Sequence, residues 1–356
     1  MIRVLVADDS PSVRELLVYI LGSDPEIEIV GCAEDGEDAV RLAQQKRPQV
    51  ITMDLHMPKL DGFEATRKIM QTCPTPIVIV SGSAGPGEME MSFRAIEAGA
   101  LVMVQRPFGI GNAMHNATSN ALIRTVKSMA EVKVVRRWPA EHAARGAPPN
   151  TAIPGPRRRQ CRLVLLGAST GGPAVLRDIL AQLPPDYPLP IVIVQHMASG
   201  FVDGFADWLS SASGFKIRLA AHDDSLGGGM AYLAPDRFQI AVTRDLRIAL
   251  SAGRPEHGMC PSVSHLFRSI HKDLRSATVA VLLTGMGKDG AHELRQLKDG
   301  GALTVVQDRA SSVVYGMPGE AIRQDAATLI LDPLEIGKLL HALGGAMPSN
   351  SPFAGI

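Results

Sequence analysis

The sequence predicts an α/β protein of two domains, each built on a sheet of mostly parallel strands. At 356 residues the chain is too long for one ordinary core, because a domain averages about 150 residues. Short β-branched runs alternate with helix-forming segments in both halves, which is the pattern of βαβ units. A stretch without apolar periodicity separates the halves, so we expect two separate cores.

The separating stretch, from Lys127 to Gln160, contains five prolines, eight Lys or Arg residues and two acids. This composition is typical of a linker. Its arginines are either solvated chain or a docking segment for an acidic partner, and both interpretations stay open. We expect four parts: a first domain over 1–126, a linker over 127–158, a second domain over 159–347 and a C-terminal tail over 348–356.

The first half contains five short apolar runs, each long enough for one strand, at residues 2–8, 26–31, 49–54, 76–82 and 100–105. Helix-forming sequence follows them, for example over 11–22 and 36–46. Parallel neighbours in a sheet need crossover helices between them. The first domain is therefore predicted to be a doubly wound, five-stranded parallel sheet.

The second half repeats the same alternation. Its strongest predicted strands cover residues 162–167, 190–196, 277–285 and 302–308. Between the second and third of these, residues 227–250 alternate apolar and polar side chains, which is typical of antiparallel hairpins. We therefore expect a second doubly wound α/β domain that includes an antiparallel hairpin.

Composition excludes several classes of function. Lys plus Arg and Asp plus Glu are both 36, so no net charge draws the chain to nucleic acid or to an anionic membrane. The four cysteines form no close pair of the kind that metal or redox motifs use. No apolar run approaches the roughly 20 residues of a membrane span. We expect a cytoplasmic protein that neither binds nucleic acid nor inserts into a membrane.

Polar side chains follow the predicted strands of the first domain where each strand ends. Asp8 and Asp9 follow the first strand, Asp54 the third, Ser81 the fourth and Arg106 the fifth. Carboxyl ends of parallel strands share one edge of the sheet, and three carboxylates at that edge repel one another unless a cation such as Mg²⁺ neutralises them. The ion would also screen an incoming phosphoryl group, so Asp54 is the central candidate for a phosphorylated nucleophile.

A plainer interpretation is that Ser10 and Pro11 cap the first helix while the acids favour its positive end. It explains each acid singly but not their joint placement on strand ends. These segments resemble the receiver domain of bacterial response regulators, a flavodoxin-like fold. The resemblance rests on VLVADDSPSVR, on DLHMPKLDG, on the Ser81 position and on the Arg-Pro pair after the fifth strand.

The resemblance implies that Asp54 accepts phosphate from a histidine kinase. It implies that Asp9 and Asp54 bind Mg²⁺ together with the backbone carbonyl of His56, that Asp8 supports this metal site, and that Ser81 contacts the phosphoryl group.

The sequence departs from the receiver pattern at two positions. Arg106 stands where the family has lysine, and the two cations differ in shape and reach. Met103 stands where an aromatic switch residue is usual. Arg106 is therefore a candidate partner of the phosphoryl group. Because of Met103, we expect the conformational switching of the domain to differ from the family pattern.

The segment Gly167-Ala168-Ser169-Thr170-Gly171 follows an apolar strand and precedes a helix-forming stretch. It lacks the spacing of a P-loop or of a dinucleotide fingerprint, but it matches G-x-S-x-G, in which a sharp turn exposes a nucleophilic serine. Glycines on both sides permit that turn, and the amides that follow can bind an oxyanion. A simple glycine-rich connector or an anion site is the alternative.

A serine nucleophile needs a base and a group that orients the base. Among the histidines of this half, only His196 immediately follows a strong strand, although the half also offers His222, His257, His265, His271 and His292. Asp289 lies in a glycine-rich loop after another strand and is the preferred orienting group. Asp308 also follows a strand, and it remains the alternative.

Four segments of this half resemble the catalytic domain of the CheB family of chemotaxis protein-glutamate methylesterases: GASTGGPAVL, VIVQHM, LTGMGKDGA and YGMPGEAI. The resemblance implies that Ser169 is the nucleophile, His196 the general base and acid and Asp289 its orienting carboxylate. It also implies that Thr170 and the backbone of Met286 line the site.

The chain departs from the CheB pattern around Pro-Ser-Val, where Cys260 and Ser264 replace the usual basic and acidic residues. We expect contacts in the substrate groove to differ there.

The resemblance implies hydrolysis of glutamate methyl esters, and deamidation of glutamines, on the cytoplasmic helices of chemoreceptors. The hydrolase site is expected to need no metal. We expect the unphosphorylated receiver to cover the site and phosphorylation of Asp54 to open it. A receiver-controlled signalling adaptor, with a second domain that binds without chemistry, is the competing hypothesis.

Overall fold

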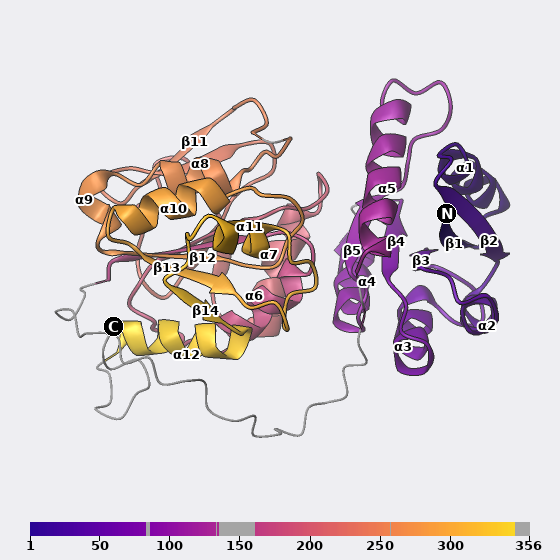
Figure 1. Cartoon of the computed structure of the whole chain (residues 1–356), viewed down its shortest axis with the longest axis horizontal. Coiled ribbons are helices and arrows are strands. Elements are labelled where there is room, and N and C mark those ends of the chain that lie inside the picture. The colour runs from indigo at the N-terminus through magenta and orange to yellow at the C-terminus, as the bar shows by residue number, and fades with distance from the viewer. Residues whose placement is uncertain (83–85, 133, 135–160, 257, 346–356) are drawn as a thin grey trace. The chain divides into compact units, whose positions relative to one another are not determined.

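The computed structural model describes residues 1–82, 86–132, 134, 161–256 and 258–345 (Figure 1). Most of the expected linker, 127–158, lies outside the described residues. The whole of the expected tail, 348–356, also lies outside them. The chain divides into two compact units, and each is described by itself below.

The first unit contains one parallel sheet of five strands in the order β2-β1-β3-β4-β5. The strands are β1 (Ile2–Ala7), β2 (Ile27–Ala33), β3 (Val50–Met53), β4 (Ile77–Ser81) and β5 (Val102–Gln105). The sequence-based prediction of a five-stranded parallel sheet is confirmed. β1 and β3 are central, and their apolar side chains are almost completely buried, as parallel sheets covered on both faces require.

Among the described residues of this unit, five helices connect and follow the strands: α1 (Pro11–Gly22), α2 (Gly36–Lys46), α3 (Gly62–Thr72), α4 (Pro86–Glu97) and α5 (His115–Ala130). Asp35 and Asp61 cap α2 and α3 by accepting hydrogen bonds from backbone amides three residues on, each at 2.8 Å. Such caps typically contribute about 1 kcal/mol. α5 continues to Ala130, beyond the predicted end of the first domain at residue 126, because Met129 is buried on its inner face like Val126.

The second unit is built on a sheet of seven strands in the order β14-β13-β12-β6-β7-β9-β8, in which all neighbours are parallel. Its strands are β6 (Leu163–Ala168), β7 (Ile191–Gln195), β8 (Ile217–Leu219), β9 (Ala231–Leu233), β12 (Thr278–Leu282), β13 (Leu303–Gln307) and β14 (Leu329–Leu331). The doubly wound parallel sheet predicted for this half is confirmed.

The predicted antiparallel hairpin is present as β10 (Gln239–Val242) and β11 (Ile248–Ser251), which pair with each other. The alternating stretch 227–250 divides, however, because its first strand, β9, joins the main sheet as a parallel partner of β7. Alternation alone does not distinguish these two outcomes, since both place one strand face against the core.

Over residues 161–256 and 258–345, the structure has seven helices: α6 (Gly172–Leu180), α7 (Val202–Ser213), α8 (Val263–Arg268), α9 (Lys272–Arg275), α10 (Ala291–Asp299), α11 (Met317–Arg323) and α12 (Pro333–Gly344). α8, α10 and α11 pack together and α6 packs on α12. Leu266 and Leu294 are fully buried between these helices and the sheet, and burial of one such side chain stabilises the fold by about 1.5–3 kcal/mol. Among the described residues, no helix has both the length and the apolar composition needed to cross a bilayer.

Both sheets contain a point where the strand order reverses. In the first unit it lies between β1 and β3, and in the second between β6 and β12. The loops at the carboxyl ends of such neighbouring strands diverge and leave a crevice, which is where functional groups gather in open α/β sheets. These two edges therefore position the candidate sites.

Candidate active site

Ser169 follows β6 directly and begins the turn into α6. Its backbone N–H donates to the carbonyl of Thr284 at 3.0 Å, and its carbonyl accepts from the N–H of Gly172 at 2.8 Å. Gly171 has a φ of 80°, in the left-handed region that favours glycine, and a Cβ there would lie 2.6 Å from the Cβ of Val313. The glycines therefore permit a tight turn that places Ser169 at the reversal point of the sheet.

His196 follows β7, the strand beside β6. The register pairs Ala168 with Gln195, and the backbone N–H of His196 donates to the carbonyl of Ala168 at 2.9 Å. Ser169 and His196 are therefore the residues that directly follow this pair, one on each strand. Local strand pairing alone brings the candidate nucleophile and the candidate base to the same edge.

Asp289 reaches this edge from the loop after β12. Oδ2 of Asp289 lies 2.9 Å from Nε2 of His196, with 4% and 6% of the two side chains exposed. Neither ring nitrogen has a described partner that meets full hydrogen-bond geometry, and Nδ1 is buried with no described partner at all. Nε2 thus faces the carboxylate, and Nδ1 is left for another group.

Asp289 is held at the start of α8. Its carboxylate accepts hydrogen bonds from Ser262 Oγ at 2.9 Å and from the backbone amides of Val263 at 2.7 Å and Ser264 at 3.0 Å. Burial by itself would raise the pKa of Asp289, but the contact with His196 and these hydrogen bonds hold that pKa well below its ordinary value. Asp289 is therefore an ionised, oriented acceptor facing the imidazole.

The alternative candidates of the sequence analysis lie elsewhere. Four other candidate histidines contact groups elsewhere: His222 the Leu250 amide, His265 Glu256, His271 Asp273 and His292 Gln296. His257 is outside the described residues. Asp308 accepts a hydrogen bond from the Ser311 amide at 3.0 Å and follows β13, one strand farther from β6 than β12 is. The structure therefore pairs His196 with Asp289.

The expected site-lining residues lie next to Ser169. A Cβ on Gly285 would lie 2.6 Å from the Cβ of Ser169, so only glycine permits this close approach of the loop that carries Met286. Among the described residues, the backbone amides of Thr170 and Met286 have no hydrogen-bond acceptor. Free amides on two loops that converge on one serine are suited to binding an oxyanion.

Thr284 supports this arrangement, and the sequence analysis assigned it no role. The residue is fully buried. Its Oγ1 donates to the carbonyl of Thr170 at 2.9 Å and accepts from the N–H of Val314 at 3.0 Å, and its own amide donates to Gln307 Oε1 at 2.7 Å. The signal available in the sequence was a hydroxyl within an apolar strand end, next to a glycine-rich loop.

Cys260 and Ser264, the two residues that depart from the CheB pattern, lie in different surroundings. Ser264 belongs to the support of Asp289, because its amide bonds the carboxylate and its Oγ accepts from the N–H of Gly290 at 2.8 Å. Cys260 is partly buried and reduced, with Sγ 3.9 Å from the carbonyl of Gly253. The helix start at Ser262, also missed by the sequence analysis, is what makes the Pro-Ser-Val segment important for the site.

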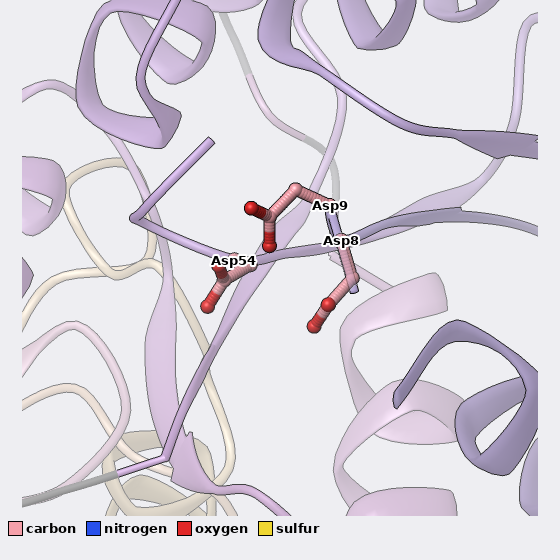
Figure 2. A group of neighbouring side chains, drawn as sticks. All are labelled: Asp8, Asp9 and Asp54. Carbon is pink, nitrogen blue, oxygen red and sulfur yellow. The ribbon is translucent and has the colours of Figure 1, made fainter. Parts of the chain in front are cut away.

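The first unit gathers three acids at its own reversal point. Figure 2 shows the side chains of Asp8, Asp9 and Asp54 together, and one oxygen from each lies within 4.8 Å of the others. Asp8 and Asp54 are buried, whereas Asp9 is exposed. The predicted convergence of these residues from two strand ends is present in the structure.

The cluster of Asp8, Asp9 and Asp54 brings negative charges close together in a partly buried place, which disfavours ionisation of its carboxyl groups. Burial, and next the nearby charge of Asp54, raise the pKa of Asp8 to about 6, although Arg106 opposes this. Burial also raises the pKa of Asp54, again against the effect of Arg106. Nη2 of Arg106 lies 3.1 Å from Oδ1 of Asp54 and 3.7 Å from Oδ2 of Asp8. The guanidinium therefore partly neutralises the cluster.

The remaining receiver candidates surround the same point. Ser81 is buried at the end of β4, and its carbonyl accepts from the N–H of Arg106 at 2.7 Å. His56 is exposed two residues after Asp54. Met103 is buried within β5. Oδ2 of Asp8 is buried and makes no hydrogen bond among the described residues, so the cluster has the oxygen donors, and the unmet charge, that suit Mg²⁺.

Two family models match the chain. The model of the response regulator receiver domain matches residues 4–118, and the model of the CheB methylesterase matches residues 164–340. The crystal structure of the Thermotoga maritima CheB methylesterase catalytic domain is 32% identical with a TM-score of 0.50, and covers 51% of this chain and 98% of that chain.

Relatives extend the match over nearly the full length. The protein-glutamate methylesterase/protein-glutamine glutaminase 1 of Syntrophus aciditrophicus is 48% identical and covers 98% of this chain and 99% of that protein. The protein-glutamate methylesterase/protein-glutamine glutaminase of Nitrosospira multiformis is 52% identical and covers 94% of each. With its own serine, histidine and aspartate assembled at one sheet edge, the chain belongs to the CheB methylesterase family and carries a response regulator receiver domain before the catalytic domain.

Proposed function

We propose that this chain is a serine hydrolase that demethylates glutamate methyl esters, and deamidates glutamines, on the cytoplasmic helices of methyl-accepting chemotaxis receptors. The observation that carries the proposal is the approach of Asp289 to His196 at the strand pair that also carries Ser169. The names of the full-length relatives supply the substrate class. The cytoplasmic location predicted from the sequence follows from this substrate and stays a prediction.

The chemistry follows from the positions of the side chains. Oδ2 of Asp289 lies 2.9 Å from Nε2 of His196, and a carboxylate beside this nitrogen favours the tautomer with its proton on Nε2, which leaves Nδ1 as the basic nitrogen. Nδ1 takes the hydroxyl proton as Ser169 Oγ attacks the ester carbonyl, and the amides of Thr170 and Met286 bind the oxyanion. Each such donor contributes about 3 kcal/mol to stabilising the transition state.

Collapse of the tetrahedral intermediate breaks the bond to the methoxy group. Nδ1 returns its proton to that group, methanol leaves, and an acyl group remains on Ser169. Water then attacks the acyl group with His196 again accepting a proton, which releases glutamate and restores the serine hydroxyl. For a glutamine substrate the same steps release ammonia.

Methanol release from a methylated receptor fragment tests the hydrolase. We expect Ser169→Ala to abolish release, and Ser251→Ala, an exposed serine on β11, to leave it unchanged. Full activity in Ser169→Ala would exclude the assigned nucleophile. Binding of the receptor fragment by a wild type that releases no methanol would favour the signalling adaptor instead.

We further propose that a histidine kinase phosphorylates Asp54. Carboxylates of Asp8, Asp9 and Asp54 and the backbone carbonyl of His56 would hold Mg²⁺, which supplies charge neutralisation for phosphoryl transfer. Asp54 Oδ attacks the phosphoryl phosphorus, and the bond to the donor's histidine nitrogen breaks. The orphaned Asp8 oxygen and the raised pKa of Asp8 support this assignment.

Phosphorylation is proposed to raise hydrolase activity by shifting the receiver away from a form that covers the site. We expect a small-molecule phosphodonor with Mg²⁺ to accelerate methanol release by the full chain. Asp54→Asn should show no acceleration, whereas Asp38→Asn, a half-buried acid on α2 paired with Arg41, should respond like the wild type. Equal rates with and without phosphodonor in the wild type would contradict the gating.

A further inference from the structure

Gln195, the last residue of β7, is buried between the nucleophile turn and the base. Its side-chain Nε2 donates to the carbonyl of Ser169 at 2.8 Å and to the carbonyl of His196 at 2.8 Å. The residue is 4% exposed. A primary amide has two N–H groups, so each is used to hold the main chain of one member of the serine–histidine pair.

The other end of the amide fits against Gly172. A Cβ at position 172 would lie 2.1 Å from Oε1 of Gln195, and Oε1 is buried without a described hydrogen-bond partner. Any side chain at this position would therefore displace the amide. This contact accounts for the third glycine of Gly-Ala-Ser-Thr-Gly-Gly, which the tight turn at Ser169 does not itself explain.

The main chain gives little other connection between these two segments. The hydrogen bond from the N–H of His196 to the carbonyl of Ala168 is the last one between the backbones of the two strands among the described residues. Beyond it, Ser169 turns into α6 and the chain after His196 continues toward α7. Gln195 bridges the two segments where their main chains diverge.

We propose that Gln195 is a positioning residue, whose amide fixes the spacing between the Ser169 and His196 main chains and hence between Oγ and Nδ1. This inference rests on the proposed hydrolase function. Displacements of about 1 Å at reacting groups lower rates by up to about 100-fold. Loss of the amide should therefore slow the chemical step while the substrate still binds.

The test uses the full chain with Gln195→Met, which keeps the length of the side chain but removes both donors. The matched control is Gln182→Met. Gln182 Nε2 donates to the carbonyls of Asp178 at 3.0 Å and Pro333 at 3.5 Å, and it too packs against a glycine, because a Cβ on Gly337 would lie 2.2 Å from that nitrogen. The Gln182 amide therefore makes the same kinds of contact as that of Gln195, but it joins α6 to the start of α12, away from Ser169 and His196.

Four quantities are measured for each variant: kcat and KM for methanol release, the rate of Ser169 labelling by a fluorophosphonate, and the free energy of unfolding. The final extent of labelling, as distinct from its rate, gives the folded fraction of each variant, and kcat is divided by this fraction. For Gln195→Met we expect kcat and the labelling rate to fall at least 10-fold, about 1.4 kcal/mol, with KM within 2-fold. Gln182→Met should keep kcat within 2-fold, even if its stability falls equally.

The inference would be overturned if Gln195→Met kept kcat within 2-fold of the wild type, or if both variants lost kcat equally. Either result would assign Gln195 a purely structural role. If Gln195→Met does not fold, Gln195→Glu provides the test, since it keeps the size and replaces the donor by an acceptor at neutral pH. It should lose at least 10-fold in kcat, and full activity would overturn the inference. A wild type that releases no methanol would instead count against the proposed function.

Discussion

Nη2 of Arg106 lies 3.1 Å from Oδ1 of Asp54, so the arginine that replaces the usual lysine contacts the proposed phosphorylation site directly. The same nitrogen is 3.7 Å from Asp8. One guanidinium therefore serves two buried carboxylates. Its planar fork also offers several N–H donors, which can bind a phosphoryl group through two oxygens where a lysine offers a point charge.

Removing this cation should destabilise the receiver. We expect Arg106→Ala to lower the free energy of receiver unfolding at pH 8 by about 2 kcal/mol in metal-free buffer, because two buried carboxylates lose their counter-charge. Mg²⁺ should restore more stability to Arg106→Ala than it adds to the wild type. Hydrogen exchange in peptides from β1 and β3 measures the free energy of receiver unfolding with and without Mg²⁺. Arg67→Ala, an exposed arginine paired with Glu64 on α3, is the control, and equal effects of the two variants would contradict the prediction.

Asp8 should make receiver stability depend on pH. Its pKa is about 6 in the folded chain against 3.8 for the free group, so the folded state binds more protons between these values and its stability falls as pH rises through them. In metal-free buffer, Asp8→Asn should be more stable than the wild type above pH 6, by on the order of 2 kcal/mol after allowance for solvent screening. The difference should vanish below about pH 4. Hydrogen exchange across this range provides the measurement, and a pH-independent difference would exclude Asp8 as the cause.

Asp289→Asn should lower kcat for methanol release by about 10⁴-fold, since the amide no longer selects the imidazole tautomer with its proton on Nε2. KM should change little because the side chain is buried behind His196. Asp308→Asn is the matched control and should keep kcat within 2-fold. The reverse order of effects would show that Asp308 orients the base.

Thr284→Val should lower both stability and kcat, because the carbonyl of Thr170 and the amide of Val314 lose their partner. An unsatisfied buried polar group costs about 1–3 kcal/mol. Thr284→Ser keeps the hydroxyl and should recover most of kcat. Urea unfolding and steady-state kinetics on the three proteins provide the comparison, and a serine variant as slow as the valine variant would contradict the assignment of the effect to the hydroxyl.

Much of the fold could be predicted from local patterns. β-Branched runs of strand length, separated by helix-forming segments, predict parallel sheets in both halves, because only crossover helices can connect parallel neighbours. The convergence of Asp8, Asp9 and Asp54 was predictable for the same reason, since carboxyl ends of parallel strands share an edge. Such patterns do not determine where a helix stops, and α5 continues past the expected boundary because its last turns bury Val126 and Met129.

Local sequence patterns identify the groups that stand at the carboxyl ends of strands: Ser169, His196, and two candidate acids. The folded arrangement selects between the acids, because strand order places β12, and so Asp289, beside β6, and moves β13 with Asp308 one position outward. It also decided which polar residues hold the site, namely Gln195, Ser262 and Thr284. Strand order and buried hydrogen bonds depend on contacts between segments far apart in the chain, and a local pattern carries no record of them.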